Sequence, residues 1–107
     1  MTDRELLELA AKAAGIEITP HPNAKIARNL VFTAGGKNWN PLTDDGDALR
    51  LAVKLGITIM FDCSSVWCEQ YGVLEHHNGD PCAATRRAIT RAAAGTARLR
   101  GHLPPPA

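Results

Sequence analysis

The chain alternates segments of helical periodicity with short β-forming segments, and this alternation most constrains its fold. Helices are predicted over Asp3–Ala14, over Thr43–Lys54, and onward from Pro81. Thr2 and Asp80 are residues suited to cap the first and third helices, and Gly15 and Gly56 are placed to end the first and second. Apolar residues cover so wide an arc of the second helix that we expect neighbours on more than one of its sides, at the centre of the fold.

The β-forming segments are short and fall into pairs. Leu30–Ala34 and Lys37–Asn40 flank a Gly35-Gly36 pair, which supplies the positive φ angles of a tight hairpin turn. Ile57–Phe61 and the weaker Val66–Glu75 form a second predicted hairpin. Short hairpins favour antiparallel pairing, so we predict an α+β fold with three helices packed on a small antiparallel sheet, in the order α-ββ-α-ββ-α.

Composition limits the class of protein. With 107 residues, 45% of them apolar, and a net charge of +1, we expect one domain over residues 1–101 and a flexible tail over 102–107. No apolar run approaches the roughly 20 residues that cross a bilayer, and the first residues lack the order of a signal peptide. Three cysteines without a secretion signal indicate reduced thiols and a cytoplasmic location.

One cluster of residue types suits metal binding or thiol catalysis. Its members are Cys63, Cys68, His76, His77 and Cys82. The cluster contains no CxxC pair, whereas a closed zinc site needs four convergent ligands. No signature of a catalytic thiol surrounds either pairing of Cys68 or Cys82 with a histidine. We therefore expect structural thiols, solvated histidines, no cofactor and no enzymatic activity, with a zinc site or a thiol enzyme as alternatives.

Charge is distributed unevenly along the chain. From residue 83 to the end there are five arginines and no acidic residue, whereas residues 1–82 carry a formal charge of −4. Arg87, Arg91 and Arg98 share one face of the third predicted helix, an arrangement that binds phosphates or an acidic partner. Aromatic residues do not interleave with them, so sequence-specific reading of nucleic acid is not supported. The simpler expectation is a solvated face paired partly with the protein's own acids.

Two features of the middle of the chain have structural explanations. The acidic residues Asp44, Asp45 and Asp47 lack the spacing of a calcium-binding EF-hand and are placed to cap the second helix. Trp39 precedes Asn40-Pro41. A buried indole is the commoner arrangement, and a surface indole would instead line a small-ligand pocket or a partner-binding site.

Three segments resemble small proteins of tailed phages and prophages. These are Leu6–Gly15, the Trp-Asn-Pro-Leu-Thr-Asp-Asp segment that begins at Trp39, and Ala83–Ile89. A more distant similarity is to phage NinX-like proteins, which also finish with an alanine-rich helix bearing arginines. The resemblance implies an accessory protein in the infected or lysogenic bacterial cytoplasm, and it implies no reaction.

From these features we expect a non-enzymatic binding module that acts on a host or phage macromolecule. The most favoured partner is a protein, with Trp39, Arg87, Arg91 and Arg98 as the candidate partner-binding residues. Nucleic acid bound by the third helix is the alternative. So small a core also makes a homodimer reasonable, with the apolar second helix shared across the interface.

Overall fold

The computed structural model describes residues 1–69 and 72–102. Along the chain its elements are α1 (Asp3–Ala14), β1 (Thr19–Pro20), α2 (Ala24–Ala27), β2 (Phe32–Ala34), β3 (Lys37–Trp39), α3 (Asp45–Leu55), β4 (Ile59–Phe61), β5 (Ser65–Cys68), β6 (Val73–His76) and α4 (Pro81–His102). Helices combined with antiparallel sheets make this an α+β fold, as predicted. The single predicted sheet is wrong, because the strands form two separate three-stranded sheets.

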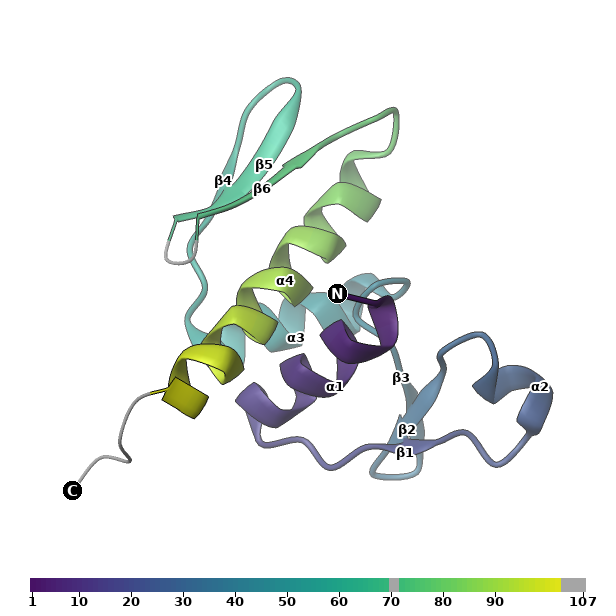
Figure 1. Cartoon of the computed structure of the whole chain (residues 1–107). Helices are drawn as coiled ribbons and strands as arrows, with labels where there is room; N and C mark the ends of the chain where they lie inside the picture. Colours follow the sequence, from purple (N-terminus) through teal and green to yellow (C-terminus); the bar gives the residue numbers. More distant parts are fainter. Residues whose placement is uncertain (70–71, 103–107) are drawn as a thin grey trace.

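The long helix α4 is the element on which the others pack. Figure 1 shows it crossing the middle of the molecule, with the β4–β6 sheet on one side and α1 and α3 along its other sides. Ala88, Ala92 and Ala93 on α4 are wholly or almost wholly buried, since small side chains let neighbouring elements approach the helix closely. The predicted central position of the second helix is corrected accordingly. On α3, Leu49 is 60% exposed and Val53 is 73% exposed.

The predicted helix ends agree closely with the structure. Thr2 caps α1 by accepting a hydrogen bond from the Glu5 amide at 3.1 Å, and Gly15 ends it at φ 69°. For α3 the cap is Asp44, so this helix begins two residues later than predicted. Asp80 accepts from the Ala83 amide at 3.0 Å at the start of α4. That helix continues through Gly95 and ends at His102, so His102 belongs to the helix and not to the predicted tail. Residues 103–107 of that tail lie outside the described residues.

The first sheet has the order β1-β2-β3 and contains the predicted Gly-Gly hairpin. Gly35 and Gly36 have φ of 59° and 80°, the left-handed values that a two-residue hairpin turn requires. The proline-containing segment Thr19–Asn23 begins with the two-residue strand β1. Pro20 is tolerated there because an edge strand leaves one side unpaired. The four-residue helix α2 was not predicted.

The second sheet has the order β4-β5-β6. The predicted strand at Val66–Glu75 is two strands, β5 and β6, which pair from Ser65 opposite His76 to Cys68 opposite Val73. Gly72, just before β6, has φ 62°. Val66, Cys68 and Val73 face α4 and form one buried cluster with its alanines.

A second buried cluster lies between α1, α3, α4 and the first sheet. It is built from residues that include Leu7, Phe32, Trp39, Leu51 and Ile89. None of the described helices is both long and apolar enough to cross a membrane.

Candidate partner-binding site

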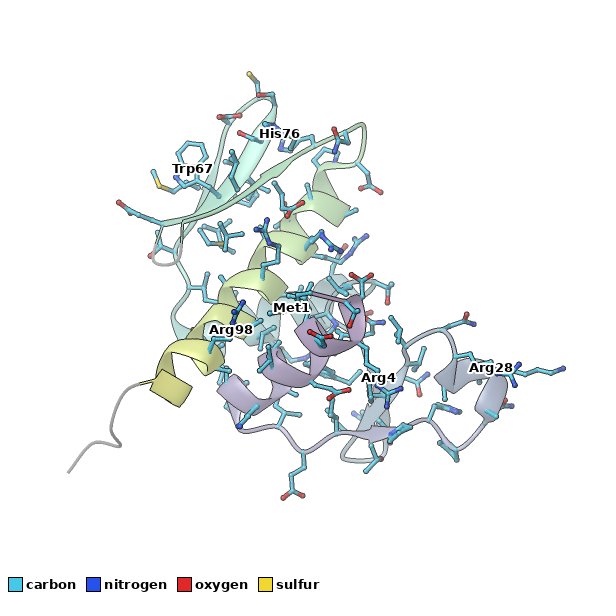
Figure 2. The ribbon with its side chains drawn as sticks, in the orientation of Figure 1. Met1, Arg4, Arg28, Trp67, His76 and Arg98 are labelled. Carbon is cyan, nitrogen blue, oxygen red and sulfur yellow. The ribbon has the colours of Figure 1, made fainter. Side chains whose placement is uncertain are left out.

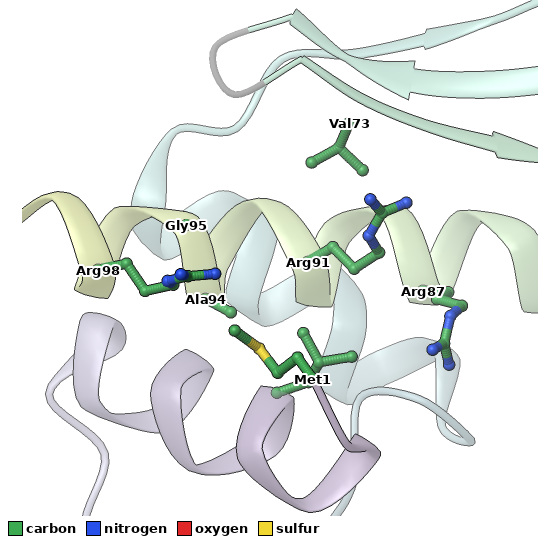
Figure 3. A pocket seen from close by; sticks show the side chains of 8 residues that line it. Met1, Val73, Arg87, Arg91, Ala94, Gly95 and Arg98 are labelled. Atoms are coloured by element: carbon green, nitrogen blue, oxygen red, sulfur yellow. The ribbon is translucent and has the colours of Figure 1, made fainter.

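The three predicted partner-binding arginines line one pocket. Arg87, Arg91 and Arg98 are four and seven residues apart, a spacing that places them on one side of a helix. The pocket measures about 320 Å³ and lies between α4, the start of α1 and the start of β6 (Figure 3). Its lining is completed by Met1, Leu6, Val73, Ala94 and Gly95.

Two of the arginines already contact carboxylates of the same chain. Arg87 lies 3.0 Å from the Asp3 carboxylate and 4.0 Å from that of Glu75. Arg91 pairs with Glu75 and also donates to the Leu74 carbonyl at 3.1 Å. These contacts agree with the expectation that the basic face is partly paired with the protein's own acids.

Arg98 differs from the other two. It is exposed, and within residues 1–69 and 72–102 no carboxylate forms an ion pair with it. Arg87 and Arg91 remain 41% and 39% exposed. Three guanidinium groups therefore face two carboxylates, Asp3 and Glu75, which leaves one positive charge in excess at Arg98.

Small residues open the pocket between the charged groups. Ala94 and Gly95 lie between Arg91 and Arg98 along the helix, and they carry almost no side chain to fill the space (Figure 3). Met1 and Val73 add apolar surface beside the guanidinium groups. A carboxylate with an apolar neighbour suits such a site, because guanidinium binds carboxylate through paired N–H donors while the apolar surface excludes water.

Trp39 does not contribute to this surface. The indole is 6% exposed and packs in the cluster between α1 and α3, where Phe32 is its cross-strand partner. The expectation of Trp39 as a partner-binding residue is therefore corrected, since a partner reaches it only if the fold opens.

The turn after Trp39 is held by hydrogen bonds. Asn40 is buried, donates from its side chain to the Leu30 carbonyl at 3.1 Å and accepts from the Leu42 amide at 2.9 Å. Asp47, 8% exposed, accepts from the Asn40 amide at 2.9 Å and from Arg50 at 2.8 Å. These contacts give the Trp-Asn-Pro turn a structural role.

Of the three acidic residues predicted to cap α3, one does so in the structure. Asp44 accepts from the Asp47 amide at 2.8 Å and so caps the helix. Asp45 pairs with Arg86 of α4 at 2.6 Å, which ties the two helices together.

The cysteine and histidine residues are dispersed over the second sheet and its neighbours. Cys63 is exposed in the turn after β4, His76 is exposed on β6, His77 follows it, and Cys82 is exposed in the first turn of α4. Among the described residues, no three His, Cys, Asp or Glu side chains are grouped to hold a metal ion. The zinc hypothesis stays a prediction.

Cys68 is buried in β5, and burial raises the pKa of its thiol because the thiolate loses solvation. A raised pKa reduces the thiolate fraction, and the thiolate is the nucleophile in thiol catalysis. The environment of Cys68 therefore suits a packing thiol.

A second surface was missed from the sequence. An apolar groove of about 370 Å³ lies between α3 and β4 above α4, and its lining includes Leu49, Ile59, Phe61, Cys82 and Ile89. Leu49 and Phe61 are 60% and 64% exposed. The wide apolar arc of α3 was the available signal, and assigning that whole arc to the core concealed the groove.

No family model matches the chain, and no curated protein or solved structure is significantly similar to it.

Proposed function

We propose that this protein is a non-enzymatic binding module that binds an acidic segment of a partner protein in the arginine pocket of α4. The observation that carries the proposal is the convergence of Arg87, Arg91 and Arg98 on one hollow. Arg98 lies beside Gly95 there and pairs with no carboxylate in the described part of the chain. An incoming carboxylate gains a charge-assisted hydrogen bond there without first displacing an internal acid.

The lining of the pocket favours a protein over a nucleic acid. Asp3 and Glu75 lie among the arginines and would repel a continuous row of phosphates. Among the described residues that line the pocket none is aromatic, so these residues offer no platform on which bases stack. Apolar side chains beside a guanidinium group suit instead an acidic residue followed by an aliphatic one.

The proposed setting is the cytoplasm of an infected or lysogenic bacterium, with a host or phage protein as the partner. The support is the resemblance of Leu6–Gly15, the segment that begins at Trp39, and Ala83–Ile89 to small proteins of tailed phages and prophages. The buried Cys68 with its raised pKa disfavours the alternative of a thiol enzyme that uses this residue as its nucleophile.

The test is fluorescence anisotropy with a labelled peptide that alternates Glu and Leu, against a matched peptide with Gln in place of Glu. We expect the Glu peptide to bind at least about tenfold more tightly, because a charge-assisted bond is worth about 1.5–3 kcal/mol. Arg98→Glu should weaken binding of the Glu peptide by a similar factor, and raising the salt concentration should weaken it further.

Arg28→Glu is the matched control. Arg28 is also exposed but lies at the C-cap of α2, on the opposite side of the molecule from Arg98 (Figure 2), so this variant should bind within about twofold of the wild type. An equal loss of affinity in both variants would show that binding depends on the net charge of the protein and not on the arginine pocket. Tighter binding of a DNA strand of equal length would reassign the partner to nucleic acid, and no binding of either probe would overturn the proposal.

A further inference from the structure

The middle arginine of the pocket, Arg91, is held by the neighbouring strand β6. Its guanidinium group lies 2.5 Å from the Glu75 carboxylate and also donates to the Leu74 carbonyl at 3.1 Å. Val73 and Glu75 lie on the same face of β6, because alternate residues of a strand share a face, and Val73 lines the pocket. Glu75 is therefore a charged neighbour of the pocket, on the face of the sheet that packs on α4.

The three guanidinium groups point in different directions (Figure 3). Arg91 points toward β6, which carries Glu75. Arg87 points away from β6, toward the start of α1, where Asp3 pairs with it at 3.0 Å. Arg98 instead extends along α4 toward the middle of the pocket. Each paired arginine is thus turned toward the element that carries its carboxylate.

The position of Glu75 decides how much positive charge the pocket offers to a ligand. Its carboxylate lies between two guanidinium groups, since it is also 4.0 Å from Arg87. The Glu75 side chain is only 19% exposed, and partly buried charges are screened by solvent less than exposed ones. A second acidic residue of a ligand that approached Arg91 would meet this charge at close range and be repelled by it.

The spacing of the arginines would otherwise suit a ligand with two acidic residues. Arg91 and Arg98 are seven residues apart on α4, which is about 10 Å along the helix axis. An extended peptide covers about 10 Å in three residues. Without the Glu75 carboxylate, a ligand with two acidic residues would form a second charge-assisted hydrogen bond, at Arg91.

From these contacts we infer that Glu75 determines the specificity of the arginine pocket. By holding Arg91, it restricts the pocket to one ligand carboxylate, at Arg98, so that an isolated acidic residue among aliphatic ones binds as well as an acid-rich segment. This inference rests on the proposed function and names the class of acidic segment that the pocket selects.

Fluorescence anisotropy with labelled peptides of Gln and Leu tests the inference. One peptide carries a single Glu, and three others carry a second Glu two, three or four positions after the first. The wild type should bind the best two-Glu peptide within about threefold of the one-Glu peptide, because Arg91 stays neutralised by Glu75. Glu75→Gln should bind it about tenfold more tightly than the one-Glu peptide, because Arg91 is then free to form a second charge-assisted bond.

The readout separates specificity from a merely structural role of Glu75. Both peptides are measured on the same variant, so a reduced folded fraction weakens both affinities equally and leaves their ratio unchanged. Gln has the length of Glu and keeps an acceptor oxygen for Arg91, so the variant should fold with an unchanged circular dichroism spectrum. Glu75→Ala is a second variant, and it should show the same preference for two acidic residues.

Glu8→Gln is the matched control, because it removes the same charge from an arginine pair on α1, Arg4–Glu8, and should keep the wild-type ratio. A wild type that binds the two-Glu peptide tenfold more tightly would overturn the inference. So would an unchanged ratio in Glu75→Gln and Glu75→Ala while the one-Glu peptide still binds, and the proposed function would then stand. Failure of the wild type to bind any of the peptides would overturn the proposed function as well.

Discussion

At the residue scale, the carboxylate of Asp47 links the turn after Trp39 to the start of α3. It is almost fully buried and accepts from the Asn40 amide and from Arg50. Asp47→Ala leaves a buried amide without its partner, so we expect a loss of about 2–3 kcal/mol in the free energy of unfolding. Asp47→Asn keeps an acceptor for the amide and should cost about 1 kcal/mol.

Urea denaturation measures both values. Glu8→Ala is the control, because it removes the exposed Arg4–Glu8 pair and should cost less than about 0.5 kcal/mol. A loss for Asp47→Ala no larger than for Glu8→Ala would show that the turn does not depend on this carboxylate.

The buried Cys68 and the exposed Cys63 should differ in their reactivity toward alkylating reagents. Cys68 is fully buried and its pKa is raised by burial, whereas Cys63 is exposed. Iodoacetamide at pH 8 should therefore modify Cys63 within minutes and leave Cys68 unmodified until denaturant is added. Mass spectrometry of digested peptides distinguishes the two sites. Rapid modification of Cys68 in the native protein would contradict the packing of β5 on α4.

At the element scale, the alanines of α4 explain why α1, α3 and the second sheet all pack on one helix. Ala92 is fully buried against the second sheet. Ala92→Leu inserts three carbon atoms into this contact, and we expect a loss of about 1–3 kcal/mol from overpacking. Ala24→Leu on the exposed α2 is the control and should change stability by less than about 0.5 kcal/mol. Thermal melting of both variants measures the difference.

The turn between β4 and β5 should respond to acid. Hydrogen bonds from the Ser64 and Ser65 amides, and from the Ser65 hydroxyl, hold the pKa of Asp62 below its usual value of 3.8. A lowered pKa in the folded state means that this carboxylate stabilises the fold above pH 3.8 and loses that effect as the pH falls through the lowered pKa. Carboxyl NMR titration should give a midpoint below 3.8, and a midpoint above it would contradict the turn geometry.

Local signals predicted the elements whose ends are fixed by nearby residues. The boundaries of α1 follow from Thr2 and Gly15, and the first hairpin follows from Gly35-Gly36. The central position predicted for α3 was wrong, because the sequence shows the same apolar arc whether a second element or solvent covers part of that arc. β1 was missed because its two residues pair with a strand more than ten residues away, which leaves little local pattern.

At the scale of the whole molecule, α4 separates two surfaces. One holds the arginine pocket, and the other holds the apolar groove between α3 and β4. The sequence predicted the three arginines as one stripe, because helical spacing alone determines which of them share a side. It did not predict that Asp3, from the other end of the chain, and Glu75 would neutralise two of them, since those contacts depend on how α1 and β6 dock on α4.

In the proposed function, an acidic protein segment binds between Arg91 and Arg98. The most direct measurement is an amide NMR titration of the protein with the Glu-Leu peptide. We expect the largest shifts at Val73, Gly95 and Arg98, saturating together with one dissociation constant, and we expect them to be lost in Arg98→Glu. Shifts centred instead on Leu49 and Phe61, or none at saturating peptide, would contradict the claim.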